Sequence, residues 1–153
     1  MRHRPRRARC SGCAGTHVLL PAWGLVRRAD SVAVIGAALL AKATGAGHRV
    51  IAAAVDRPAS TVRGWLRRFL VRAEAVRVLF TGLLHALDPR AGSVPPSGSG
   101  FADAVEVLGR AGAAGVLRLG PCPVWEFASM ASGGRLLAPP SIPPGGPAVS
   151  NTS

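Results

Sequence analysis

An apolar seam between residues 62 and 87 constrains the fold of this chain more than any other feature. Its members alternate at steps of four and three residues through more than three heptads, and they are Val62, Leu66, Phe69, Ala73, Val76, Phe80, Leu83 and Leu87. Such spacing predicts one long α-helix with a continuous apolar face, and Pro89 ends it. The chain is therefore expected to be mainly α-helical. Either a second copy covers the 62–87 seam, giving a homodimer, or residues 31–43 fold back onto it.

Two shorter helices are expected before the seam. Ser31 has the side chain of an N-cap, and the run "VAVIGAALLAKA" after it predicts a buried helix that ends before residues 44–47. A second helix is expected over about residues 48–55. Pro58 then presets the first turn of the long helix. Asp56 lies where the turn between them needs a residue that tolerates left-handed backbone.

Glycine and proline are concentrated after this region, and they divide the chain into five parts. Residues 1–30 form an irregular basic segment, and residues 31–88 form the helical domain. Residues 89–100 have the composition of a linker. Residues 101–119 form a possible helix that its glycines weaken. Residues 120–153 are expected to be a disordered tail, because such Gly/Pro-rich sequence cannot build a core.

The charge balance points to a nucleic-acid partner. Nineteen basic residues stand against seven acidic ones, and all basic residues except Lys42 are arginines. Arginine binds phosphate with two parallel hydrogen bonds and stacks on bases. The arginines cluster at residues 2–9 and 63–77, which favours nucleic acid. Two alternatives stay open, namely a composition set only by a high-GC coding sequence and binding to an anionic membrane surface.

Membrane and export signals are weak in this sequence. No apolar run approaches the roughly 20 residues that span a bilayer. The apolar stretch near the N-terminus contains Pro21 and lacks a small-residue cleavage site, which disfavours a secretory signal. A cytoplasmic protein is expected, associated with the nucleoid if it binds DNA.

Residues 49–69, "RVIAAAVDRPASTVRGWLRRF", meet the requirements of a DNA-reading helix pair: a short helix, a tight turn and polar side chains early in the next helix. The stretch resembles the helix-turn-helix of bacterial transposase N-terminal regions and homeodomain-like regulators. The matching residues are Ile51, Ala52, Ser60, Thr61, Val62, Trp65 and Leu66. It departs at Asp56, where the family prefers glycine, and at Arg57, where an apolar residue is usual. The resemblance implies a homeodomain-like core with an extended third helix.

This resemblance places the start of a recognition helix near Ala59. Arg63 and Arg67 are four residues apart and share a face. We expect Arg63 to read a base, in the first instance a guanine, and Arg67 to contact bases or phosphates. For Arg68 both phosphate contact and plain solvation stay open. The candidate DNA-binding residues are Arg57, Ser60, Thr61, Arg63, Gly64, Arg67 and Arg68.

Cys10 and Cys13 have the CxxC spacing with which two thiolates on a tight turn supply half of a tetrahedral zinc site. Residues 5–120 are similar to high-GC bacterial proteins that join a zinc ribbon to a helix-turn-helix and are related to insertion-sequence transposases. That resemblance implies a second CxxC upstream, so the chain is expected to be truncated relative to them. The half-site is either a remnant without tightly held zinc or is completed by His3 and His17.

No set of residues predicts catalysis. Transposases hold two metal ions with carboxylates, and no arrangement of strands is expected to gather the acidic residues that follow the helix pair. The prediction is a DNA-binding protein that needs no cofactor and has double-stranded DNA as its partner. Two alternatives stay open: a helical protein-interaction module, and a decayed transposase fragment without a selected function.

Overall fold

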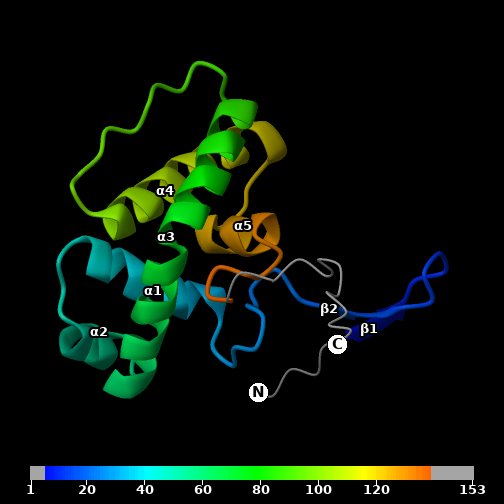
Figure 1. Ribbon diagram of the computed structural model, residues 1–153, viewed down its shortest axis with the longest axis horizontal. Helices are drawn as coiled ribbons and strands as arrows, with labels where there is room; N and C mark the ends of the chain where they lie inside the picture. The colour runs from blue at the N-terminus through cyan, green and yellow to red at the C-terminus, as the bar shows by residue number, and fades with distance from the viewer. Residues whose placement is uncertain (1–5, 139–153) are drawn as a thin grey trace, which may run out of the picture.

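The computed structural model describes residues 6–138. This part of the chain is mainly α-helical, with five helices packed into one body and a two-stranded antiparallel hairpin that projects from it (Figure 1). The elements are β1 (Arg6–Arg9), β2 (Thr16–Leu19), α1 (Val32–Ala43), α2 (His48–Ala54), α3 (Ala59–Leu87), α4 (Gly100–Leu119) and α5 (Val124–Ala131).

Helix α1 begins and ends where its flanking residues predict. The Ser31 hydroxyl accepts the N–H of Val34 at 3.4 Å, which satisfies one free donor of the first turn. At the other end Gly45 has a φ of 98°, a left-handed conformation that glycine adopts without strain. The N–H of Ala46 then donates to the carbonyl of Ala41 at 3.0 Å. This arrangement is a Schellman motif, and it turns the chain toward α2.

The apolar seam of α3 is buried inside the chain. Its residues Val62, Phe69 and Phe80 are fully inaccessible to solvent. Helix α4 covers most of the seam, and the ring of Phe101 meets Phe69 edge to face with centroids 4.8 Å apart. The seam is therefore an intrachain core and not the dimer interface that its spacing suggested. The alternative expectation, that residues 31–43 fold back onto the seam, is also wrong for most of it. Helix α1, which contains these residues, makes a smaller contact with α3 than α4 does.

Helix α4 forms where the possible helix over 101–119 was expected, and it is better packed than its glycines suggest. A Cβ at Gly112 would lie 2.9 Å from Val124, and one at Gly115 would lie 2.9 Å from the ring of Phe127. Both positions thus lack a side chain where α5 approaches α4. The same glycines that weaken α4 as an isolated helix allow this close packing, which offsets their low helix propensity.

The expectation of a disordered tail over 120–153 is wrong for residues 120–138. Helix α5 lies in this segment, and Leu136 and Leu137 after it are 1% and 2% exposed. The hydroxyl of Ser129 donates to the carbonyl of Gly24 at 2.7 Å, so this segment also joins the N-terminal part of the chain. A few large side chains stabilise the segment despite its composition. Residues 139–153 lie outside the described part.

The expected linker at residues 89–100 has no regular secondary structure before α4 begins at Gly100. Ala91 and Val94 still pack against the core. Among the helices that the structure describes, none has both the length and the apolar character needed to cross a bilayer.

Replacement of Gly36 by alanine is expected to destabilise the fold. A methyl group at Gly36 would overlap the indole of Trp125, a residue of α5 that packs on α1. Overpacking of this kind costs about 1–3 kcal/mol in the free energy of unfolding, measured by chemical denaturation. Gly109→Ala is the matched control, because no atom lies within 4 Å of its added methyl. That variant should gain up to about 1 kcal/mol from helix propensity, and a loss as large as that of Gly36→Ala would contradict this packing.

Candidate nucleic-acid interface

A tight turn joins α2 to α3. Asp56 has a φ of 51°, as expected for the left-handed position of this turn. The N–H of Arg57 donates to the carbonyl of Ala52 at 3.0 Å, which ends α2 in the same way as Gly45 and Ala46 end α1. Pro58 then precedes the first turn of α3. The backbone of this turn therefore directs the start of α3 across α2.

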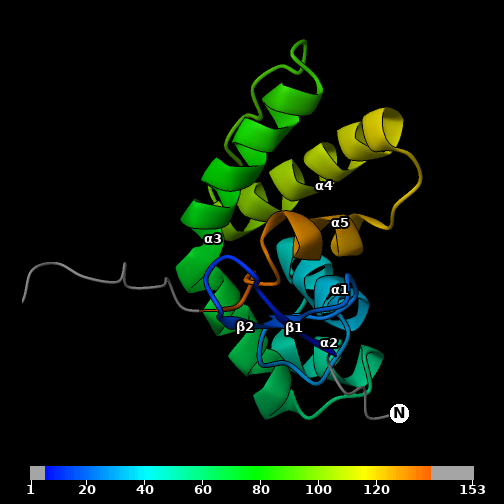
Figure 2. The ribbon, with the colours of Figure 1, turned by 90° about the vertical axis from the view of Figure 1, so that its right-hand side faces the viewer.

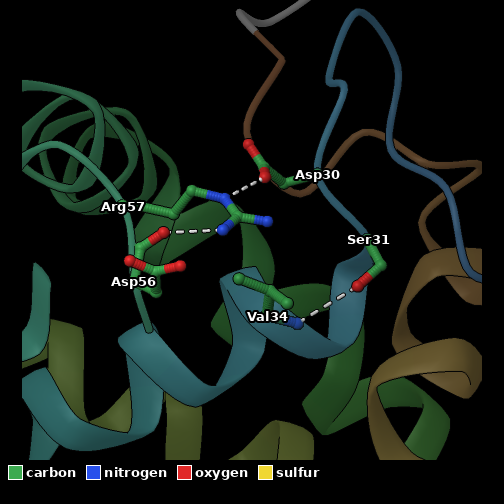
Figure 3. A network of polar contacts seen from close by, with 5 residues as sticks. All are labelled: Asp30, Ser31, Val34, Asp56 and Arg57. Carbon is green, nitrogen blue, oxygen red and sulfur yellow. Dashed lines mark hydrogen bonds and ion pairs between the residues drawn. The ribbon is translucent and has the colours of Figure 1, made fainter. Parts of the chain in front are cut away.

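The side chain of Arg57 fixes this turn to the segment before α1. Its Nε donates to the Asp30 carboxylate at 2.6 Å, and its Nη1 donates to the carbonyl of Asp56 at 2.6 Å (Figure 3). The hydrogen bond and the charge of Asp30 raise the pKa of the Arg57 guanidinium. Arg57 therefore positions the turn through polar contacts.

Replacement of Asp56 by glycine is expected to stabilise the chain. Aspartate tolerates left-handed backbone better than most residues, but glycine adopts it without steric cost. The gain should be up to about 1 kcal/mol in the free energy of unfolding, measured by urea denaturation. Asp56→Val is the matched opposite variant, because a β-branched residue is strained at positive φ. Equal stability of the two variants would show that this φ carries no strain.

Apolar side chains hold α2 and α3 at a fixed angle. Ile51 and Ala52 of α2 are 1% and 6% exposed, and they share a core with Val62, Trp65 and Leu66 of the contacting helix α3, which are also buried. Ala52 was expected as the small residue at the point of approach, and its burial agrees with that place. The opposite face of α3 is consequently turned outward.

The outward face of the first turns of α3 carries the candidate residues predicted from the sequence. Ser60, Arg63, Arg67 and Arg68 are exposed, and Thr61 and Gly64 are half-buried. These residues lie on one side of α3. The structure therefore brings six of the seven predicted residues together, and it uses the seventh, Arg57, in the turn.

Arg63 and Arg67 line an open groove of about 510 Å³. Lys42 from the end of α1 and His48 from the start of α2 line the same groove, and the start of α4 closes it near Phe101. The four basic side chains come from three helices. Sequence reasoning did not assign Lys42 or His48 to this surface, since only the fold brings them beside Arg63.

A second group of arginines lies beyond the other edge of this face. Arg28 lies beside Arg68, and burial together with the nearby charge of Arg68 lowers the pKa of the Arg28 guanidinium. Its Nε is buried without a hydrogen-bond partner among the described residues. Arg27, Arg28 and Arg135 line a cavity of about 200 Å³. This group was also missed from the sequence, because its members lie in two segments more than 100 residues apart.

We call the surface formed by Lys42, Arg63, Arg67 and Arg68 at the start of α3 the basic face. Acidic neighbours do not neutralise its charge. Ion pairs join Asp30 to Arg57, Glu74 to Arg77, and Glu106 to Arg110. Within the described part of the chain, Lys42, Arg63, Arg67 and Arg68 take part in no such pair. Positive charge thus surrounds the exposed start of α3, and it is available to an anionic partner.

The two cysteines of the CxxC motif lie in the loop of the β1–β2 hairpin. The N–H groups of Cys13 and Gly12 and the Cys13 thiol hydrogen-bond the Cys10 sulfur, and these bonds lower the pKa of the Cys10 thiol. Among the side chains that the structure describes, no three metal-binding residues form a group. His3 and the side chain of His17, the other candidate ligands, lie outside what the structure describes. The described side chains therefore bring Cys10 and Cys13 of the predicted half-site together without a third candidate ligand beside them.

The fold and this surface define a mainly helical chain with a basic face at the start of its long helix. Comparisons with protein-family models, with curated proteins and with solved structures found no match for it.

Proposed function

We propose that this protein binds double-stranded DNA by placing the first turns of α3 in the major groove. The observation that carries the proposal is the basic face itself, in which an exposed helix surface lies between two groups of cations from other elements. The major groove of B-DNA is about 12 Å wide and accepts one α-helix. A phosphate strand borders it on each side, so cations on both sides of α3 match its electrostatics.

In this proposal each group of residues has its own role. Arg63 points from the exposed face and reads a base, for which guanine offers two acceptors to one guanidinium. Ser60, Thr61 and Arg67 contact bases or the backbone next to it. Lys42 and His48 contact phosphates of one strand, and Arg28 and Arg68 contact those of the other. Arg57 acts indirectly, because its bonds to Asp30 and Asp56 hold the turn that orients α3.

A salt titration tests the proposal. Binding to a duplex releases counterions, so the logarithm of affinity should fall linearly with the logarithm of salt concentration, by about 0.9 per phosphate contacted. Lys42→Ala is expected to weaken binding to all duplexes equally and to reduce the slope by about one contact. Fluorescence anisotropy at several salt concentrations measures both quantities.

Arg90→Ala is the matched control, because it removes the same charge from the exposed segment between α3 and α4. It should leave the slope unchanged. Equal slopes for Lys42→Ala and the unchanged protein would remove Lys42 from the interface. Absence of any salt-dependent duplex binding would contradict the proposal and favour a helical interaction module instead.

A further inference from the structure

A cluster of arginines lies where the segment before α1 meets the segment after α5. The N–H of Val26 donates to the carbonyl of Gly134 at 2.9 Å, and Figures 1 and 2 show the two segments side by side. Arg27, Arg28 and Arg135 line the cavity of about 200 Å³ at this junction. Three cationic side chains from two distant segments therefore converge on one small space.

No acidic side chain lines this cavity. All seven acidic residues of the chain lie within the part that the structure describes, and none of them is among the lining residues. No ion pair of the described residues includes Arg28. Burial and the nearby charge of Arg68 lower the pKa of the Arg28 guanidinium. Like charges that converge in this way cost free energy, and a bound anion offsets that cost.

Arg28 also has a hydrogen-bond donor that the protein does not use. Its Nη1 donates to the carbonyl of Arg27 at 3.2 Å, whereas its Nε is buried and no described atom accepts a hydrogen bond from it. A buried charged donor without an acceptor is costly, and such groups in proteins are commonly satisfied by an ion or a water molecule. An anion bound at Arg28 supplies the acceptor and the negative charge together.

The backbone holds Arg27 in this cluster against its local preference. Its φ is 57°, and the N–H of Arg28 donates to the carbonyl of Leu25 at 3.1 Å, which closes a tight turn around it. Glycine or asparagine is favoured at a turn position with positive φ. Strained residues of this kind are concentrated at functional sites. The turn thus presents a guanidinium to the cavity at a position where glycine has the lower steric cost.

We propose that the cavity of Arg27, Arg28 and Arg135 binds the dianionic phosphate of a phosphate monoester. Guanidinium groups donate in planar forks that match the oxygens of a phosphate. A monoester carries nearly two negative charges at neutral pH, so it balances several converging cations better than a singly charged anion does. Sites that enclose a whole small molecule measure roughly 300–1,000 Å³. This smaller cavity therefore takes the phosphate group, and the rest of the ligand stays outside.

This ligand goes beyond the proposed function, because the interior of a DNA duplex contains only phosphodiesters. In the proposed function Arg28 contacts a strand, where each phosphate carries a single negative charge. A monoester is a different ligand for the same guanidinium. The test contains no DNA, so its outcome does not depend on whether α3 binds a duplex.

Methyl phosphate and dimethyl phosphate are matched probes, because one is a dianionic monoester and the other a singly charged diester. Nuclear magnetic resonance of the isotopically labelled full chain follows the arginine Nε–H signals, and Arg28→Gln assigns the signal of Arg28. Methyl phosphate at neutral pH and constant ionic strength should shift this signal saturably. Dimethyl phosphate should bind at least about tenfold more weakly, since it loses a charged acceptor. Equal affinities, or no saturable shift with methyl phosphate, would overturn the proposal.

Arg27→Gly separates phosphate binding from folding. It removes one guanidinium and relieves the positive φ, so the affinity for methyl phosphate should fall about tenfold while the thermal unfolding midpoint stays or rises. Arg28→Gln should weaken binding by a similar factor. Arg90→Gln is the matched control, because it removes an arginine from the exposed segment between α3 and α4, and its affinity should not change. Isothermal titration calorimetry measures all three. Full affinity in Arg27→Gly and Arg28→Gln, or an equal loss in Arg90→Gln, would contradict the assignment of the cavity.

Discussion

Replacement of Phe69 by alanine should lower the free energy of unfolding by about 3–5 kcal/mol, the range for deletion of a buried aromatic ring. Phe69 is fully inaccessible to solvent and packs edge to face on Phe101. The substitution leaves a cavity between α3 and α4, the two helices with the largest mutual contact. Chemical denaturation followed by circular dichroism measures the change.

Leu70→Ala is the matched control, because the neighbouring Leu70 is 58% exposed. Its free energy of unfolding should change by no more than about 0.5 kcal/mol. The measurement also separates the two interpretations of the seam. An intrachain core gives an unfolding midpoint that does not depend on protein concentration, whereas a dimer seam gives a concentration-dependent midpoint. A concentration-dependent midpoint would contradict the packing described here.

The double variant Arg63→Ala with Arg67→Ala should lose about 2–4 kcal/mol of binding free energy on a preferred duplex, or roughly 30- to 1,000-fold in affinity. Both side chains lie on the exposed face of α3 and line the groove beside Lys42. In the proposed function Arg63 contributes base contacts, so the loss on random duplexes should be smaller. A selection on random duplexes provides the preferred site, and fluorescence anisotropy measures both affinities.

The double variant Arg90→Ala with Arg110→Ala is the control, because it removes the same number of arginines from the chain. These arginines lie in the linker and on the exposed side of α4, away from the groove. This control should bind nearly as tightly as the unchanged protein. Equal losses for the two double variants would mean that net charge alone attracts DNA. Equal losses of Arg63→Ala with Arg67→Ala on preferred and random duplexes would mean that neither arginine reads sequence.

The predictable parts of the fold are those that local backbone chemistry decides. Ser31 begins α1, Pro58 begins α3, and Asp88 with Pro89 ends it, because caps and prolines act on their own turns. Asp56 was predicted in left-handed backbone for the same reason, and its φ of 51° confirms the prediction. Heptad spacing also predicted which face of α3 is buried.

The identity of the covering element could not be read in the same way. An apolar face on α3 fits a second copy, α1 or α4 equally well, because heptad spacing describes one surface and not its partner. Gly112 and Gly115 weaken α4 by propensity, yet they admit α5 at short range. Helix propensity alone therefore predicts that these glycines destabilise the fold. The prediction has the wrong sign when the free-energy cost in helix propensity is smaller than the gain from the packing that the glycines allow.

The amino-acid sequence by itself determined where α1, α2 and α3 begin and end, which face of α3 is buried, and the presence of Arg63 and Arg67 on its outer face. Only the tertiary structure decided that the seam is an intrachain core, that residues 120–138 belong to it, and that Lys42, His48 and Arg28 surround the start of α3. The physical reason is one of range. Caps, turns and helical periodicity act within a few residues, whereas burial and electrostatic grouping depend on segments that approach only in the folded chain.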